Sequence, residues 1–101
     1  MREVIHQGEI LKIEKIKVPV LVVSKDFFNR TGEVFACPIY REGTPGPLHI
    51  WIHGKEVDGY AQCEKMALLD MQVRGYAKVD RVPPGEMMDI VDAIQGIFDY
   101  I

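Results

Sequence analysis

Residues 48–53 (LHIWIH) place two histidines and a tryptophan at alternate positions. Alternate residues of a β-strand share a face, so His49, Trp51 and His53 are expected opposite the leucine and isoleucines between them. The two histidines would be roughly 13 Å apart at about 3.3 Å per residue, too far to bind one metal ion together. The pattern suits an aromatic surface that stacks on a flat ring, beside an imidazole that exchanges protons near neutral pH. The alternative is that Trp51 covers the sheet or forms a dimer contact.

Acidic residues outnumber basic ones by 15 to 12, which gives a net charge of −3. A protein that binds nucleic acid by general electrostatic attraction would be basic, so that role is not favoured. Lys12, Lys15 and Lys17 form the only close basic cluster. Such a cluster can hold a phosphate locally, or it can be a solvated strand edge that lysines protect from aggregation.

Length and composition indicate one globular domain over residues 1–101. Of the 101 residues, 48% are hydrophobic and 27% are charged, which argues against disorder. The apolar runs are too short to cross a bilayer and no secretory segment is evident, so a cytoplasmic protein is expected. Cys37 and Cys63 lack metal-site spacing and are too few for a disulfide framework. Two reduced, partly buried thiols are therefore expected. A disulfide between them is the alternative, and no residue pattern calls for it or for a metal or cofactor.

Apolar periodicity indicates a mainly β protein. Alternation predicts a half-buried strand over 8–16 with a turn or bulge near Glu14–Lys15, and the continuous run 18–23 predicts a central strand buried on both faces. A short helix is expected at 25–29, capped by Ser24. Further strands are expected at 33–39, 48–53, 60–65, 66–69 and 78–82, with the third and fourth continuous or broken by a bend. Loops are expected at 41–47 and 54–59, and a turn or short helix at 70–75.

The C-terminal segment predicts an amphipathic helix that packs on a mostly antiparallel sheet. Two prolines and a glycine at 83–85 mark its start, and Pro84 suits a first helical turn. Apolar residues then recur at helical spacing, while aspartates and Gln95 fill the other face. The apolar positions are Met87, Ile90, Val91, Ile94, Ile97, Phe98 and Ile101. The predicted fold class is α+β, with strands dominating.

Residues 19–39 (PVLVVSKDFFNRTGEVFACPI) resemble the core of the MazF/PemK/Kid toxins of bacterial type II toxin–antitoxin systems. Residues 8–10 (GEI), 63–75 (CEKMALLDMQVRG) and 81–94 (RVPPGEMMDIVDAI) resemble the family's first strand, later strand and last helix. Each piece is moderately specific by itself. Their order and spacing extend the resemblance over nearly the whole chain.

The resemblance implies an SH3-like small barrel of the MazF/PemK/CcdB type, with short helices and a C-terminal amphipathic helix. It implies a homodimer that acts as an mRNA interferase, cutting single-stranded RNA without a metal ion or cofactor. In that reaction the ribose 2′-hydroxyl attacks the neighbouring phosphate. An antitoxin protein would bind across the same surface and block it.

The positions that the resemblance marks as catalytic carry different residues here. The family's Arg before the strand proline is Val18, and its Ser or Thr after the next strand is Tyr40. The Arg and Asp that flank the later cysteine are Gln62 and Glu64, so Glu64 alone keeps its charge type. The polar loop between the first two strands shrinks to 14–18. Losing a placed acid or base costs on the order of 10²–10⁴ in rate, so an active enzyme needs a rearranged site.

Candidates for that rearranged site fall into two groups. The catalytic candidates are Glu64 as the base, Lys17 beside the vacant arginine position, and Tyr40 as a donor to phosphate. The RNA-binding candidates are Arg41, His49, Trp51, His53 and Gln62. Each of these residues also has a plain structural interpretation as a solvated or sheet-covering side chain.

A second interpretation is a catalytically inactive protein of the same fold that acts by binding. One version resembles CcdB, which poisons DNA gyrase through the end of its C-terminal helix. The last residues here, 94–101 (IQGIFDYI), are loosely similar, although an amphipathic helix explains the same letters. Another version is an antitoxin-binding or regulatory dimer.

Overall fold

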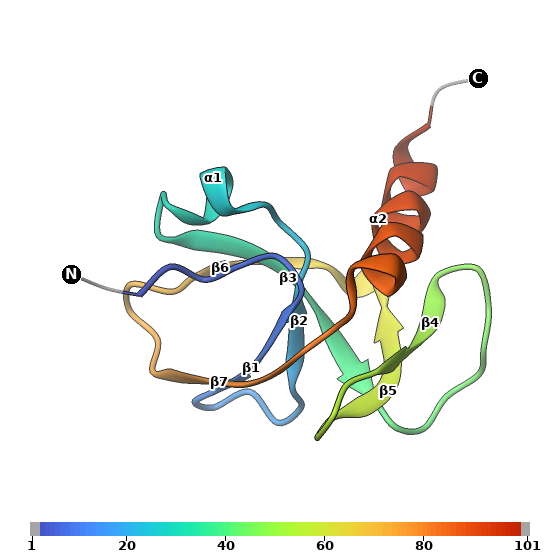
Figure 1. Ribbon diagram of the computed structural model, residues 1–101, viewed down its shortest axis with the longest axis horizontal. Helices are drawn as coiled ribbons and strands as arrows, with labels where there is room; N and C mark the ends of the chain where they lie inside the picture. Colours follow the sequence, from blue (N-terminus) through green and yellow to red (C-terminus); the bar gives the residue numbers. More distant parts are fainter. Residues whose placement is uncertain (1–2, 100–101) are drawn as a thin grey trace.

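The computed structural model describes residues 3–99, in which a curled antiparallel sheet is joined by a long C-terminal helix (Figure 1). The strands are β1 (Glu9–Ile13), β2 (Val20–Val22), β3 (Glu33–Tyr40), β4 (His49–His53), β5 (Asp58–Gln62), β6 (Ala67–Asp70) and β7 (Tyr76–Arg81). The helices are α1 (Asp26–Asn29), the 3-10 helix η1 (Cys63–Lys65) and α2 (Pro84–Phe98). The strand order is β4-β5-β3-β2-β1-β7, and β6 pairs separately with β3.

β2 is the central strand that the sequence predicts, because all three of its residues are buried. Leu21 faces the core beneath α2, whereas Val20 and Val22 face a second core between β1, β3 and β6. Antiparallel pairing with β1 on one side and β3 on the other satisfies its backbone. The preceding strand ends at Ile13, and the predicted turn follows at Glu14 and Lys15, where Lys15 has φ 70°.

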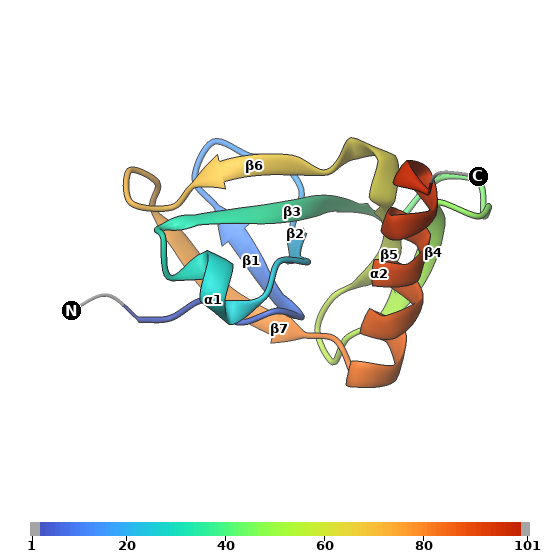
Figure 2. The same ribbon diagram turned by 90° about the horizontal axis from the view of Figure 1, so that it is seen from above.

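β3 changes partner along its length (Figure 2). Its first half pairs with β6, from Glu33 opposite Asp70 to Ala36 opposite Ala67, and its end pairs with β5. The 3-10 helix η1 lies between β5 and β6, so the predicted strand material at 60–69 is broken by a bend. The expected loop 54–59 is shorter than predicted, because β5 begins at Asp58.

α2 is the predicted amphipathic helix, and Met87 and Ile90 bury its first turns against the sheet. Its far end differs from the prediction, since Ile97 and Phe98 are 42% and 71% exposed. The last turns of α2 extend beyond β4 and β5 (Figure 1), which agrees with the exposure of these side chains. Ile101, predicted to continue the stripe, lies outside the described residues. Within 3–99, no helix is long and apolar enough to span a membrane.

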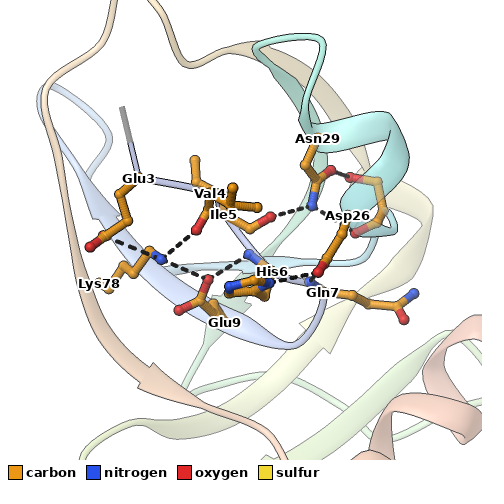
Figure 3. Close-up of polar contacts among 10 residues, drawn as sticks. Glu3, Val4, Ile5, His6, Gln7, Glu9, Asp26, Asn29 and Lys78 are labelled. Carbon is orange, nitrogen blue, oxygen red and sulfur yellow. Dashed lines mark hydrogen bonds and ion pairs between the residues drawn. The ribbon is translucent and has the colours of Figure 1, made fainter. Parts of the chain in front are cut away.

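Ser24 does not cap α1 as predicted, because Lys25 occupies the N-cap position. The Ser24 hydroxyl instead donates to Asn29 Oδ1 at 2.5 Å and accepts the Phe35 N–H at 2.9 Å. Asn29 Nδ2 donates to the Ile5 carbonyl at 2.7 Å (Figure 3). Asn29, the one buried polar residue among those described, thus ties the N-terminal segment to α1.

Charged side chains hold the same N-terminal segment from its other side (Figure 3). Lys78 Nζ donates to the Val4 carbonyl at 2.6 Å and lies 3.2 Å from Glu3 and 3.1 Å from Glu9. His6 Nδ1 contacts Asp26 Oδ2 at 2.7 Å. These contacts tie residues 3–9 to β7 on one side and to α1 on the other.

Candidate functional site

The outer face of β4, β5 and β3 carries most of the predicted site residues. β4 and β5 pair with His49 opposite Gln62, and with Trp51 opposite Tyr60. The Trp51–Tyr60 pair continues onto β3, where Tyr60 lies opposite Tyr40. Residues directly opposite in an antiparallel pair project to the same side. The intervening residues project to the other side, where Ile39, Ile52 and Ala61 belong to the core under α2.

An aromatic row therefore crosses three strands. Trp51 and Tyr60 meet edge to face, with ring centroids 4.9 Å apart and an interplanar angle of 83°. Tyr40 extends the row, and the Lys65 ammonium lies 5.2 Å from its ring centroid. All three aromatic residues are partly accessible. The row can therefore stack on a planar ligand and hold an anion beside it.

His49 and Glu64 form the closest side-chain pair on this face. His49 Nε2 lies 2.6 Å from Glu64 Oε2, and His49 Nδ1 lies 2.9 Å from the Thr44 carbonyl oxygen. Glu64 reaches the imidazole because Cys63, which begins the 3-10 helix, donates its N–H to the Leu48 carbonyl, next to His49 at the start of β4. The imidazole is thus held between the 41–47 loop and η1.

Both contacts of the His49 ring are with acceptors, a carboxylate and a carbonyl. The ring satisfies both only when each nitrogen carries a proton, which is the imidazolium form. The Glu64 hydrogen bond, followed by the Thr44 one, raises the pKa of His49 above its usual value of 6.5. The hydrogen bond from His49 lowers the pKa of Glu64 below its usual 4.5. Both acceptors favour the imidazolium, so a protonated His49 would lie side by side with the Glu64 carboxylate.

The remaining predicted residues lie at the edges of this face. Arg41 is 80% exposed and its only ion pair within residues 3–99 is a loose 3.8 Å contact with Asp58. His53 lies at the far end of β4. Its backbone N–H donates to Glu86 Oε1 at 2.8 Å, and its ring Nδ1 lies 3.4 Å from the same oxygen. The two predicted histidines therefore have separate environments, and they do not act together.

Lys17 lies exposed in the turn before β2, and no ion pair among the described residues engages it. The Ile39 N–H donates to the Pro19 carbonyl at 2.9 Å, so this turn runs beside the end of β3. Lys17 is two residues before Pro19, so it lies near the end of β3 and outside the aromatic row.

Sequence reasoning missed Tyr60, Lys65 and the Thr44 carbonyl. Tyr60 is two residues from Gln62 in a predicted strand, so strand periodicity was a signal that placed both on one face. Lys65 and Thr44 gave no comparable signal. Their positions depend on the 3-10 helix and on the path of the 41–47 loop.

Three hollows of about 300 to 460 Å³ lie elsewhere. The largest is lined by the N-terminal segment, Met71 and Tyr76. Another lies between α2 and Arg81, and the third surrounds the 70–75 turn. The candidate face is therefore separate from these hollows. Within 3–99, no group of three or more potential metal ligands comes together.

The fold and this face can be compared with known proteins. The family of PemK-like, MazF-like toxins of type II toxin–antitoxin systems matches residues 8–98. This chain belongs to that family. A search of curated protein sequences gave no significant match.

Solved structures show the same fold. A MazE–MazF structure from Deinococcus radiodurans contains a chain with a TM-score of 0.86 at 19% identity, over 96% of this chain and 98% of that one. An endoribonuclease from a mycobacterial species has a TM-score of 0.83 at 19% identity, over 97% and 94%. A mycobacterial endoribonuclease in complex with its cognate antitoxin has 0.80 at 20% identity, over 93% and 94%. The predicted MazF-type small barrel is confirmed.

Proposed function

We propose that this protein is the toxin of a type II toxin–antitoxin system and cuts single-stranded RNA without a metal ion. The family match over residues 8–98 supports the toxin role, and an endoribonuclease among the structural relatives supports the reaction. One observation carries the catalytic part of the proposal, the 2.6 Å contact between His49 and Glu64. It provides a base and a cation together beside an aromatic surface.

The reaction starts with attack of a ribose 2′-oxygen on the adjacent phosphorus. Glu64 Oε2 is bonded to His49, so Oε1 takes the 2′-hydroxyl proton. The His49 imidazolium and the Lys65 ammonium stabilise the negative charge that develops on the phosphorane oxygens. The bond from phosphorus to O5′ then breaks, O5′ receives the Tyr40 hydroxyl proton, and a 2′,3′-cyclic phosphate remains.

RNA binding uses the rest of the face. Trp51 and Tyr60 stack on bases, and such stacking is worth about 1–3 kcal/mol per base. The Gln62 amide lies opposite His49 and hydrogen-bonds a base edge or a phosphate. Lys17, in the turn before β2, and Arg41, directly after β3, are both exposed and bind flanking phosphates.

Two protein partners belong to this proposal. The antitoxin complexes among the structural relatives support an antitoxin that covers this face. Family membership supports a homodimer. In this proposal the catalytic groups all come from this chain, and neither partner takes part in the reaction.

Purified protein incubated with single-stranded RNA and a chelator tests the reaction. Wild type should yield fragments ending in a 2′,3′-cyclic phosphate and a 5′-hydroxyl, and Glu64→Gln should cut about 10²–10⁴ times more slowly. Glu56→Gln, a matched change in the exposed turn between β4 and β5, should cut as wild type does. Intact RNA at high protein concentration, or wild-type cutting by Glu64→Gln, would refute the proposal.

A catalytically inactive protein that acts by binding is the second candidate. The exposed apolar end of α2, formed by Ile97 and Phe98, favours a partner there, and DNA gyrase is the target to test. Inhibition of supercoiling with a trapped cleavage complex should be lost in Phe98→Ser. Met88→Ser, at another exposed position of α2, is the control. Absence of inhibition by the wild type removes this candidate.

A further inference from the structure

Cys37 and Cys63 lie opposite each other where β3 meets the start of η1. The β3–β5 pairing sets Ile39 opposite Ala61. Cys37 is two residues before Ile39, and Cys63 is two residues after Ala61. The same antiparallel register therefore sets Cys37 opposite Cys63. Cys63 is one residue past the end of β5, so this register is continued by a single step.

The backbone hydrogen bonds identify the kind of pair. The Cys63 N–H donates to the Leu48 carbonyl on β4 at 2.8 Å, and Cys37 lies opposite Leu21 on β2. The N–H of Ile39, two residues along the same strand edge, also donates toward β2. The backbone N–H and C=O groups of the two cysteines therefore point away from each other, so the two residues form a non-hydrogen-bonded pair. In a regular ladder such non-hydrogen-bonded pairs have Cα atoms about 4.5 Å apart, within the span of a disulfide.

The two thiols share one environment. Cys37 and Cys63 are 0% and 1% exposed in the same hydrophobic cluster, and both are free. A hydrogen bond between the thiols, followed by burial, raises the pKa of Cys37. The same hydrogen bond lowers the pKa of Cys63. We assign the first attack to Cys63, because it begins the three-residue η1 and its pKa is the lowered one.

We propose that Cys37 and Cys63 are a modification site that closes to an intramolecular disulfide under peroxide and displaces Glu64 from His49. An S–S bond is about 2 Å long, shorter than any contact between two separate thiols, so closure pulls Cys63 toward β3. Glu64 is the next residue in a three-residue 3-10 helix, and its carboxylate must stay within hydrogen-bonding distance of His49. The regulatory consequence rests on the proposed nuclease function, whereas disulfide formation does not.

The oxidation needs one peroxide molecule per pair. The Cys63 thiolate attacks one peroxide oxygen, the O–O bond breaks, and Cys63 becomes a sulfenic acid as hydroxide leaves. The Cys37 sulfur then attacks the Cys63 sulfur, the S–O bond breaks, and a second hydroxide leaves. The two thiol protons convert the hydroxides to water, so two thiols and one hydrogen peroxide give one disulfide and two waters. Because both thiols are buried, peroxide enters when η1 opens locally.

Intact mass spectrometry of the whole protein tests the chemical step. Hydrogen peroxide should remove two hydrogens, about 2 Da, a thiol reductant should restore them, and digestion should give one peptide pair joined through Cys37 and Cys63. Cys37→Ala, which leaves Cys63 without a partner, should show no such loss. An unchanged mass, oxygen addition at either cysteine, or a disulfide between two chains would overturn the proposal.

Two further measurements separate the consequence from the nuclease proposal. Oxidation should lower the pKa of His49 measured by NMR, because Glu64 no longer holds the imidazolium, and this readout needs no RNA. RNA cleavage should fall on the order of 10- to 100-fold and recover on reduction, as expected for a misplaced catalytic group. A formed disulfide with unchanged His49 titration would refute the coupling. If reduced wild type never cuts RNA, the proposed function fails while the mass and NMR results still decide this inference.

Discussion

His49 on β4 lies directly opposite Gln62 on β5. The family resemblance expects an arginine at position 62, and side chains directly opposite in an antiparallel pair have Cβ atoms about 4.5–5.5 Å apart. The carboxylate next to that position is retained as Glu64, and it contacts His49. We infer that His49, on the neighbouring strand, supplies the positive charge that the resemblance expects at position 62, and its hydrogen bond to Glu64 favours the imidazolium.

An exchange of charge between these two positions tests that inference. His49→Gln should lower RNA cleavage about 10²–10³-fold, because the cation beside the phosphorane is lost. Adding Gln62→Arg to His49→Gln should raise the cleavage rate at least about tenfold above that of His49→Gln. The guanidinium then lies on the neighbouring strand, directly opposite position 49. His6→Gln is the matched control, because His6 contacts Asp26 far from this face. Wild-type cleavage by His49→Gln would contradict the assignment, and no recovery in the double variant would contradict the exchange.

The His49–Glu64 pair should stabilise the protein in a defined pH window. The folded pKa of His49 is raised, so its contribution is full below the usual 6.5 and disappears as pH rises through the folded value. The folded pKa of Glu64 is lowered, so its contribution is full above the usual 4.5 and disappears as pH falls through the folded value. The stability difference between wild type and Glu64→Gln should therefore be largest between pH 4.5 and 6.5. Thermal unfolding from pH 3 to 9 measures it, and a flat difference would contradict the pairing.

The regular strands and the long helix were predictable because the spacing of apolar residues within each segment indicates its secondary structure. The three buried residues of β2 and the spaced apolar residues of α2 follow from burial of strands and helices. The site was less predictable, since His49 and His53 have the same periodicity but meet Glu64 and Glu86 respectively. Those partners depend on the break at η1 and on where α2 crosses β4. Ser24 shows the same limit, because its hydroxyl serves a buried asparagine instead of a helix cap.

Removal of Trp51 should affect RNA binding more than chemistry. Trp51→Ala removes one stacking surface, so the Kd for single-stranded RNA should rise about 5- to 150-fold, whereas Trp51→Phe should retain most of the affinity. Fluorescence anisotropy in a Glu64→Gln background measures binding without cleavage. Phe27→Ala removes an aromatic side chain that is 72% exposed on α1 and should leave the Kd unchanged. Equal affinities for wild type and Trp51→Ala would show that the aromatic row only covers the sheet.

Asp80 should be a major anchor of the turn between β4 and β5. Its carboxylate accepts backbone N–H groups from Lys55, Glu56 and Val57, at 3.1, 2.5 and 2.8 Å. Asp80→Ala leaves these donors without a fixed partner and should lower the free energy of unfolding by about 1–3 kcal/mol in urea denaturation. Asp89→Ala, an exposed aspartate on α2, should change it by less than about 0.5 kcal/mol. Similar values for both variants would mean that water satisfies the turn equally well.

Gly59 on β5 leaves no room for a side chain against β3 beside the site. It has φ +154°, and an added Cβ would lie 2.8 Å from the Tyr40 carbonyl oxygen and 2.9 Å from Ile39 Cγ2. Gly59→Ala should therefore cost roughly 2–4 kcal/mol of stability and shift the strand that carries Tyr40. Gly96 is the opposite case, with nothing within 4 Å of an added Cβ on the surface of α2. Gly96→Ala should raise stability by about 1 kcal/mol, because alanine favours helix.

The two glycine variants together separate stability from site geometry. Cleavage at a temperature where both proteins remain folded should fall for Gly59→Ala and stay unchanged for Gly96→Ala. The loss in Gly59→Ala should persist when Gly96→Ala is added to restore part of the stability, since the two sites are distant and their effects on unfolding should add. Full cleavage by folded Gly59→Ala would show that the position of Tyr40 does not limit the reaction, and the proton to O5′ would then have to come from another group.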